Sequence, residues 1–547
     1  MDRGSLAIVL HAHLPFVRHP EYEAFLEERW LFEALTETYI PLLQRFERLH
    51  ADGVPFRVTI SLSPSLLAML EDPLLQERYL AHVGKLITLS EREIERHQNH
   101  PHLAGLADLY RRLFVEARGL FLAHDGRLSR AFSRLHEQGS VELITTAATH
   151  GILPLLMAQP RTVEAQLRIG FDFFESVFGF RPAGMWLPEC AYAPGLDDAL
   201  RRHSIRYFIL ESHGIDHASV APFRGVHAPV FTPSGVAAFG RDQGCTKEVW
   251  SAQEGFPGDP DYREFYRDIG FDLDQGYIQN ALGLDVRAMT GVKYHRITGA
   301  TSHKELYDPR AATAKADLHA GVFLDKRVAH FRQLVGVTDV APIIVAPFDA
   351  ELFGHWWFEG PQWLELFIRK AAFDQTEFEL GTLGDYLDRH PVHQTGQPGT
   401  STWGHAGYFD TWLSGRTDWI YDHLVDAAAR LERVAGRIAS GLNETRPRGS
   451  GAPLIDRALD QAVRELLLAQ SSDWPFIISS GTSAQYAERR VRDHVARLHW
   501  LLDAVETGRI DEEKLAAVEL VDNPFPHADW RVFSEDIAEQ ARDYSPT

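Results

Sequence analysis

Short apolar runs alternate with helical patterns over the first two thirds of the chain. The runs have the length of buried strands, and they cover residues 6–10, 56–60, 141–145, 184–187, 207–210 and 343–346. Because helical stretches separate them, the pattern predicts an α/β fold built on a parallel sheet or barrel.

Three segments depart from this alternation. Residues 71–138 carry repeated leucines among many charges and predict an inserted helical subdomain. Residues 213–300 are rich in glycine, proline and aromatic residues and predict long loops over an active face. The last part of the chain predicts helices at 418–441, 455–471, 482–507 and 511–521, with a loop at 446–453. We therefore divide the chain into a catalytic barrel domain, 1–395, and a C-terminal helical domain, 396–547.

Composition and charge limit the possible partners. The 547-residue chain has a formal net charge of −21, which disfavours nucleic acid and anionic membranes and is compatible with a neutral glucan. Its two cysteines, Cys190 and Cys245, cannot form a disulfide framework or a C-x-x-C metal site. No signal-peptide pattern opens the chain, and no run approaches about 18 apolar residues. We expect a cytoplasmic protein, monomeric or weakly oligomeric, with no nucleic-acid or membrane partner.

Histidines and acids follow five of the predicted strands directly. Active sites of barrels and parallel sheets lie at the C-terminal ends of the strands and draw on several of them. The recurrence therefore predicts one convergent site, formed by His11 and His13, His150, Glu189, Glu211 and His213, and Asp349.

Glu189 and Asp349 could form the carboxylate pair of a retaining glycosidase. In that chemistry one carboxylate attacks the anomeric carbon, and the other protonates the leaving oxygen and then deprotonates the acceptor. The alternatives are an ion pair or helix cap for Glu189 and a helix N-cap for Asp349. The rings of Trp356, Trp357 and Phe358, which follow Asp349, could stack on a pyranose.

The histidines allow two interpretations. His11 and His13, two residues apart, would share one face of a strand and could bind a metal ion with Asp349 or Asp216. We favour hydrogen bonding to sugar hydroxyls or to the nucleophile. For His150, His213 and His355 a purely structural role is an equal alternative, and Cys190 fits best as small buried filler.

Taken together, the motifs resemble glycoside hydrolase family 57, and within it most closely the 1,4-α-glucan branching enzymes. The resemblance runs nearly end to end, and Ala469 to Phe476 is similar to part of the helical C-terminal domain of those enzymes. The other motifs are His11-Ala12-His13-Leu14-Pro15-Phe16, Thr149-His150-Gly151, Trp186-Leu187-Pro188-Glu189-Cys190, residues 346–358 and Trp403-Gly404-His405-Ala406-Gly407-Tyr408.

The resemblance implies an incomplete (β/α)7 barrel with a helical insertion and a C-terminal helical domain that completes the substrate cleft. It implies a retaining mechanism without metal or other cofactor, with Glu189 as nucleophile and Asp349 as acid/base, acting on an α-1,4-glucan (amylose, amylopectin or glycogen). The implied substrate-binding residues are His11, His13, His150, Trp186, Arg263, Trp357, Trp403, Trp412 and Asp473. For the tryptophans, ordinary core packing is the alternative.

One departure from the family pattern concerns the product. Branching enzymes of this family resemble one another in a mobile loop that carries a tyrosine near the active site. Here no tyrosine occurs between Tyr207 and Tyr262, and Phe256 occupies the aromatic position of the Gly-(aromatic)-Pro-Gly-Asp motif. We therefore expect branching with appreciable hydrolysis. The alternatives are an α-amylase or 4-α-glucanotransferase of the same family and, more remotely, a non-catalytic glucan-binding protein or a metal-dependent hydrolase.

Overall fold

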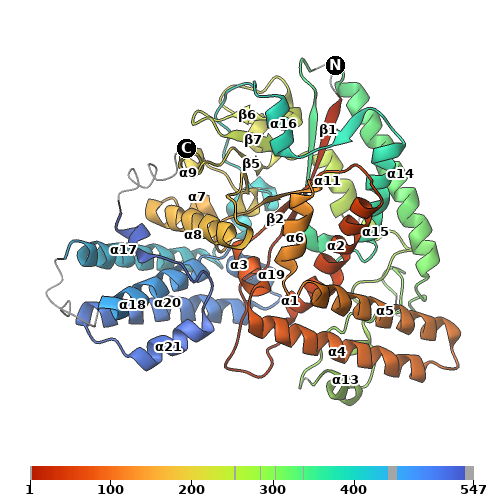
Figure 1. Cartoon of the computed structure of the whole chain (residues 1–547), viewed down its shortest axis with the longest axis horizontal. Helices are drawn as coiled ribbons and strands as arrows, with labels where there is room; N and C mark the ends of the chain where they lie inside the picture. The colour runs from red at the N-terminus through yellow and green to blue at the C-terminus, as the bar shows by residue number, and fades with distance from the viewer. Residues whose placement is uncertain are drawn as a thin grey trace.

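The structure, a computed structural model, describes residues 3–251, 254–283, 285–301, 303–336, 338–441 and 452–535. Parallel strands follow one another around a barrel in chain order. They are β1 (Gly4–Ala12), β2 (Val58–Leu62), β3 (Val141–Ile144), β4 (Gly184–Trp186), β5 (Tyr207–Leu210), β7 (Ala237–Gly240) and β8 (Ile343–Asp349). Of these, β1, β2, β5 and β7 are labelled in Figure 1.

The barrel consists of two sheets with two different seams. One sheet has the order β3-β2-β1-β8, with β9 (Phe378–Leu380) also pairing β1, and the other has the order β4-β5-β7-β6, where β6 (Val230–Phe231) is antiparallel to β7. A bridge between Thr145 and Met185 joins β3 to β4. Across the other seam, the N–H of Asp242 donates to the carbonyl of Val345 at 2.9 Å, while β7 and β8 form no ladder within the described residues. The predicted incomplete (β/α)7 barrel is confirmed.

Strand β1 lies at the centre of the first sheet and brings the first two site residues together. All nine of its residues are buried, as expected for a parallel strand covered on both faces. Its register with β8 pairs Leu10 with Phe348 and His11 with Asp349. A histidine and a carboxylate are therefore adjacent at the C-terminal ends of neighbouring strands.

The predicted helical insertion is present as α4 (Pro73–Arg96), α5 (Pro101–Ala123) and α6 (Leu128–Glu137). Helices α4 and α5 lie against each other and extend away from the barrel (Figure 1). The carboxylate of Asp72 begins α4 by accepting the N–H of Leu75, and Pro73 occupies the first helical position, which requires no N–H donor.

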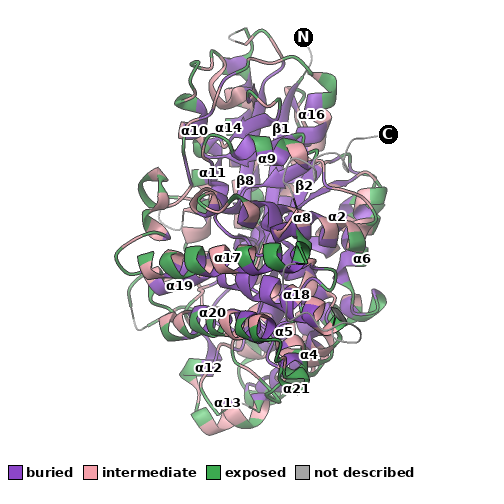
Figure 2. Ribbon diagram, turned by 90° about the vertical axis from the view of Figure 1, so that its left-hand side faces the viewer, coloured by how far each residue is buried: buried purple, intermediate pink, exposed green. Residues whose placement is uncertain are grey.

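The C-terminal part is helical, as predicted. Its helices are α17 (Asp418–Ala439), α18 (Ala452–Ala469), α19 (Asp473–Ser480), α20 (Ala484–Thr507) and α21 (Glu512–Val521). Figure 2 shows buried faces of α17, α18 and α20 turned toward one another and exposed residues on their outer sides. Helix α19 was not predicted, and residues 446–451 of the predicted loop lie outside the described residues. The division of the chain at residue 395 stays a prediction.

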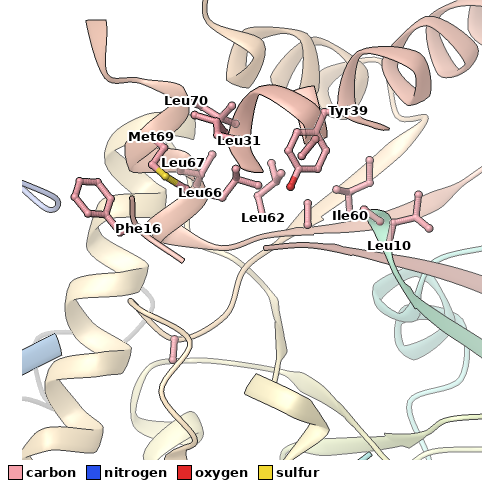
Figure 3. Close-up of a cluster of buried hydrophobic side chains, with 14 of the residues drawn as sticks. Leu10, Phe16, Leu31, Tyr39, Ile60, Leu62, Leu66, Leu67, Met69 and Leu70 are labelled. Carbon is pink, nitrogen blue, oxygen red and sulfur yellow. The ribbon is translucent and has the colours of Figure 1, made fainter. Parts of the chain in front are cut away.

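An aliphatic cluster packs one side of the barrel beside the strand ends (Figure 3). It joins Leu10 of β1 and Ile60 of β2 to the apolar side chains of α3 (Pro64–Leu70), and Tyr39 lies among them. The hydroxyl of Ser63 begins α3 by accepting the N–H of Leu66 and also contacts His13, so this cluster fixes the base of the site.

Most remaining helices cover the barrel and its loops. They are α1 (Arg29–Ala34), α2 (Ile40–Ala51), α7 (Leu153–Leu156), α8 (Pro160–Phe178), α9 (Leu196–Arg202), α10 (Ser212–Asp216), α11 (Gln243–Trp250), α12 (Ile269–Asp272), α13 (Gln275–Leu282), α14 (Pro309–Leu334), α15 (Gly360–Phe373) and α16 (Leu383–Arg389). None of the helices in the described residues has the length and apolarity needed to cross a bilayer.

The prediction of loops throughout residues 213–300 is wrong at one place that matters. Strand β7, with the sequence Ala-Ala-Phe-Gly, is a full member of the barrel and pairs β5 in parallel. It is short and lacks β-branched residues, so its own pattern carries little strand signal. Burial between neighbouring elements, rather than local propensity, makes it a strand.

Candidate active site

Glu189 and Asp349 occupy the C-terminal ends of two barrel strands. Glu189 lies in a short 3₁₀ turn, Pro188–Cys190, two residues after β4, and Asp349 is the last residue of β8. The charge of Asp349 raises the pKa of Glu189, so the two groups lie close enough to interact electrostatically.

The backbone at Glu189 is strained. Glu189 and Cys190 have φ angles of 58° and 50°, in the left-handed region that costs a non-glycine residue roughly 1 kcal/mol or more. The N–H of Cys190 donates to the carbonyl of Leu187 at 2.8 Å, and the N–H of Trp403 donates to that of Glu189 at 3.1 Å. Cys190 itself is fully buried and unpaired by any disulfide. The strained turn fixes the direction in which the Glu189 carboxylate points.

Two donors hold the Glu189 carboxylate. The indole N–H of Trp403 donates to Oε2 at 2.7 Å, and the hydroxyl of Ser472 donates to Oε1 at 3.0 Å. Burial raises the pKa of Glu189 to about 7, with Asp349 and Asp473 adding to the rise, while the two hydrogen bonds oppose it. Both donors favour the ionised form, which is the form a nucleophile requires.

Asp349 has a different environment. Within the described residues no donor reaches its side chain, and it does not cap the following 3₁₀ turn, Ala350–Leu352, so the helix-cap interpretation fails. Burial and the neighbouring Glu351 raise the pKa of Asp349 to about 7, against the opposing effect of Arg241 and His13. This environment favours the protonated form, which is the form a general acid requires.

Glu351 is a third carboxylate of the site. Its Oε1 accepts the backbone N–H of His13 at 3.2 Å and also the hydroxyl of Tyr39. Burial raises the pKa of Glu351 as well. The sequence suggested only a first-turn charge here, whereas the structure makes Glu351 the neighbour that keeps a proton on Asp349.

A directed chain of hydrogen bonds runs to Glu189 from the first strands of the barrel. Its contacts are Ser61 Oγ to His11 Nδ1 at 3.1 Å, His11 Nε2 to His150 Nε2 at 3.0 Å and His150 Nδ1 to Ser472 Oγ at 2.8 Å. Burial lowers the pKa of both histidines, so both are neutral and each has one N–H and one acceptor nitrogen.

The proton positions in this chain follow from its last member. Because the single hydroxyl hydrogen of Ser472 goes to Glu189, the N–H of His150 must be on Nδ1, and its Nε2 must accept. His11 then donates from Nε2 and accepts at Nδ1 from the hydroxyl of Ser61. The chain thus aligns every donor toward the Glu189 carboxylate, which supports the predicted role of these histidines at the nucleophile.

His13 contacts an acid of the C-terminal part of the chain. Its Nδ1 contacts Ser63 Oγ at 2.9 Å, and its Nε2 contacts Asp473 Oδ2 at 3.0 Å. Burial lowers the pKa of His13, but Asp473, together with Glu189 and Glu351, raises it further than burial lowers it. These acids therefore favour the protonated form of His13, which makes no hydrogen bond to Glu189 or Asp349 in the described structure.

Three of the tryptophans predicted to bind sugar pack against residues of the site and of its loops. Trp186 is fully buried and stacks on His11, with ring centroids 4.5 Å apart. Trp403 is partly buried, contacts Trp186 edge to face at 5.1 Å and is occupied by its bond to Glu189. Trp412 is 1% exposed and packs on the backbone of Gly404, so it supports the loop that carries Trp403.

Trp357 and Arg263 are placed in the core. Trp357 is 2% exposed and lies 5.4 Å from Trp363, measured between ring centroids. Arg263 is 4% exposed, and its guanidinium lies 4.2 Å from the ring of Phe358. Sugar contact by Arg263, Trp357 or Trp412 stays a prediction, and it would require these side chains to leave their buried positions.

The two other histidines make structural contacts. His355 Nδ1 lies 3.0 Å from Glu37 Oε2, and His213 Nε2 lies 2.9 Å from the carbonyl oxygen of Gly407. The metal interpretation of His11 and His13 is not favoured, because their ring nitrogens contact hydroxyl, imidazole or carboxylate partners. In the part of the chain that the structure describes, the groups with metal-ligand spacing are His227, Asp242 and His330, and Glu465, His494 and Asp522.

Several site residues were not predicted from the sequence. Ser61, Ser472 and Tyr39 are ordinary residue types with no local signal, although Ser472 precedes the predicted Asp473. Arg241 had no signal either. Its guanidinium donates to Glu211 at 3.1 Å and lies 5.7 Å from the Trp403 ring, so it links Glu211 to the site.

Comparison with known proteins agrees with this geometry. Residues 7–280 match the model of glycosyl hydrolase family 57, and residues 430–533 match that of the 1,4-alpha-glucan branching enzyme C-terminal region. A 1,4-alpha-glucan branching enzyme from Thermococcus kodakarensis is 33% identical over 96% of this chain and 77% of that relative.

Two solved structures are similar over almost their whole length. The alpha-amylase AmyC from Thermotoga maritima is 43% identical, covering 98% of this chain and 100% of its own, with a TM-score of 0.90. The GH57-type branching enzyme from Pyrococcus horikoshii is 31% identical, covering 97% of each chain, with a TM-score of 0.86. The resemblance noted in the sequence is confirmed, and the chain belongs to glycosyl hydrolase family 57.

Proposed function

We propose that this chain is a 1,4-α-glucan branching enzyme. It cleaves an α-1,4 linkage, holds the released glucan as a glycosyl-enzyme and transfers it to a 6-hydroxyl, which forms an α-1,6 branch. We further propose Glu189 as nucleophile and Asp349 as acid/base. The donor is an α-1,4-glucan, with amylose, amylopectin and glycogen as candidates, and no cofactor takes part. The cytoplasmic location and the monomeric or weakly oligomeric state stay predictions.

In the first half-reaction, Glu189 attacks the anomeric carbon while Asp349 gives its proton to the glycosidic oxygen. The two donors on Glu189 and the pKa values of about 7 for both carboxyl groups support this assignment. Glu189 loses its negative charge as the bond forms, and this loss lowers the pKa of Asp349, because a neighbouring carboxylate no longer repels its ionised form. Asp349 therefore reaches the second half-reaction as a carboxylate.

In the second half-reaction, Asp349 takes the proton of the incoming hydroxyl, the oxygen attacks the anomeric carbon and Glu189 leaves. A sugar 6-hydroxyl gives a branch, and water gives hydrolysis. Bulk water is present at about 55 M, so transfer requires a site that excludes water and positions the acceptor. The missing loop tyrosine supports an appreciable share of hydrolysis.

The observation that carries the proposal is that two site residues belong to the C-terminal part of the chain. Ser472 and Asp473 lie within the stretch that matches the branching-enzyme C-terminal model. Ser472 donates to Glu189 and Asp473 pairs with His13, so this region contributes directly to the charge state of the catalytic groups. The region is therefore part of the active site and not an appended module.

An α-amylase is the second candidate. It is favoured by the 43% identity to a protein described as an alpha-amylase, which covers that chain completely, and by the absence of the loop tyrosine. It shares the proposed glycosyl-enzyme with the branching reaction and differs only in the acceptor.

Incubation with amylose separates the candidates. A branching enzyme forms new α-1,6 linkages, which debranching and chain-length analysis count, in addition to reducing ends. An α-amylase forms reducing ends without branches. Glu189→Gln should abolish both products, and undiminished function in that variant would instead support a non-catalytic glucan-binding protein.

A further inference from the structure

We propose that His227, Asp242 and His330 form a binding site for one divalent transition-metal ion of the zinc type, which fastens the open seam of the barrel. Each of the three residues offers one ligand atom, and these atoms all lie within 4.8 Å of one another. The three come from separate elements: the 3₁₀ turn Gly225–His227, the start of α11 and the last third of α14.

Asp242 is arranged to leave one oxygen available. Its Oδ1 accepts the N–H of Cys245 at 2.6 Å as the cap of α11. Its Oδ2 lies 4.0 Å from His330 Nδ1, which is too long for a hydrogen bond and suits two ligands that share an ion. The cap bond fixes the carboxylate in the way that outer partners usually orient a metal ligand.

One of the two imidazoles has a ring nitrogen that is free to bind a ligand. His227 Nδ1 is buried and has no hydrogen-bond partner in the described structure. The rings of His227 and His330 lie 5.0 Å apart and nearly perpendicular, at 87°. An unpartnered buried ring nitrogen is costly, and a metal ion would satisfy it. Burial lowers the pKa of both histidines, so both present neutral rings, the form that binds metal.

The donor set and the spacing favour zinc over the alkaline-earth ions. Two imidazoles and one carboxylate are ligands of Zn²⁺, whereas Ca²⁺ and Mg²⁺ prefer oxygen alone. At metal–ligand distances of about 2.0–2.1 Å, tetrahedral ligands lie roughly 3.3 Å apart. The side chains therefore need to approach by up to about 1.5 Å, which rotation of the partly exposed His330 can supply.

Besides Asp242, one acid and one arginine act on the two imidazoles. Asp216 acts on His227 and favours a cation there, whereas Arg327, one helical turn before His330, disfavours one. Arg327 is directed toward Glu248, with Nη2 3.6 Å from its carboxylate, and it also acts on Cys245. The carboxylate of Asp242 is thus the charge that decides in favour of a cation.

The other group with metal-ligand spacing is a contrast. Glu465, His494 and Asp522 are fully buried in the C-terminal helices, but Arg490 and Arg497 form ion pairs with Asp522 there. Two guanidinium groups already supply positive charge to the carboxylates, so their charge is compensated without a metal ion.

The proposed site lies at the seam between β7 and β8, where a bound ion would hold the two strands together. The N–H of Asp242 makes the backbone bond to Val345 that spans the seam between β7 and β8. The turn Gly225–His227 packs on both strands, and α14 leads into β8. An ion bound by all three elements would link β7 to β8, which form no strand ladder within the described residues. Arg241 of the active site directly precedes Asp242 in the sequence.

Zinc binding to the untagged full-length chain tests the proposal. The chain is stripped with EDTA, dialysed and titrated with Zn²⁺ by calorimetry, and Co²⁺ is used as a spectroscopic probe. We expect one Zn²⁺ per chain with micromolar or tighter affinity, visible Co²⁺ absorption and a higher Tm with Zn²⁺. His330→Ala should weaken binding at least tenfold, and the double variant His227→Ala, His330→Ala should abolish the Co²⁺ signal and the Tm increase.

His499→Ala is the matched control. His499 has a similar exposure of 29%, and its Nε2 lies 3.9 Å from a carboxylate oxygen of Asp426, but it belongs to neither group with metal-ligand spacing. It should bind Zn²⁺ like the unaltered protein. The proposal is overturned if the unaltered chain binds no Zn²⁺, or if both His330→Ala and the folded conservative variant His330→Gln bind it with unchanged affinity.

Discussion

Trp403→Phe tests the inference that Trp403 acts on Glu189, the proposed nucleophile, rather than on the sugar. Phenylalanine keeps a ring against Trp186 but removes the N–H that donates to Glu189 at 2.7 Å. A hydrogen bond to a charged group contributes roughly 1.5–3 kcal/mol, and one pKa unit corresponds to about 1.4 kcal/mol. The pKa of Glu189, already raised to about 7, should therefore rise by about one to two units more.

The assay is the pH dependence of kcat/KM on a short α-1,4-glucan. In the proposed mechanism the active form has Glu189 ionised and Asp349 protonated, so activity should fall at low pH when both are protonated and at high pH when both are ionised. Both limbs should lie near neutrality in the unaltered protein. In Trp403→Phe the acidic limb should move up by about one to two pH units, with a loss of roughly 10- to 100-fold below it.

Trp363→Phe is the control, since Trp363 is 1% exposed and its indole N–H has no hydrogen-bond partner in the described structure. Its pH profile should match that of the unaltered protein. A Trp403→Phe enzyme with an unmoved acidic limb and a raised KM would show that Trp403 serves as a sugar platform, and it would refute the reasoning from the hydrogen bond.

Four further outcomes follow from the same contacts. Ser472→Ala removes the second donor to Glu189 and should move the acidic limb upward by about one unit, and an unchanged limb would exclude Ser472 from the charge network. Glu351→Gln removes the nearest charge that raises the pKa of Asp349, so the alkaline limb should move downward; an upward shift would contradict this. Asp349→Asn should abolish turnover yet raise Tm at pH 8 and not at pH 4. The folded state holds the proton of Asp349 more tightly, so its ionisation destabilises the fold progressively from about pH 4 to pH 7, by up to about 4 kcal/mol, and an equal Tm at pH 8 would refute the burial argument. Phe256→Tyr should leave the ratio of branches to reducing ends unchanged, because Phe256 is buried against His319, and a higher ratio would place this ring at the acceptor site.

The parts of the fold that were predictable are those with a strong local pattern. Strand β5 has its predicted bounds, and the long amphipathic helices α4, α5 and α20 all lie within predicted helical segments. Strand β2 begins at Val58, two residues later than predicted, because Pro55 and Phe56 lead into it without pairing. Strand β7 was missed because its four residues become a strand through the neighbours that cover them.

The site was predictable where reactive side chains directly follow a strand. It was not predictable where the chain turns away from the strand end. Glu189, Asp349 and His11 come together as expected, but Trp357 does not join them. Gly354 has a φ of 115°, and a Cβ there would lie 1.7 Å from the carbonyl oxygen of Glu37. This close approach turns the chain away from the strand end, so that Trp357 is buried in the core while Trp356 stays 54% exposed, which strand periodicity alone does not show.

The choice between branching and hydrolysis does not reside in the network that surrounds the two carboxylates. Trp403, Ser472 and Glu351 each act on a carboxyl group, and none of these contacts distinguishes a sugar hydroxyl from water. Both products also arise from one glycosyl-enzyme and one base, so a change in the pKa of Asp349 alters both rates alike. Variants of the network should therefore change the rate and its pH limbs while the ratio of products stays constant. We expect that ratio to depend instead on what covers the site, and the predicted effect of the absent loop tyrosine belongs there.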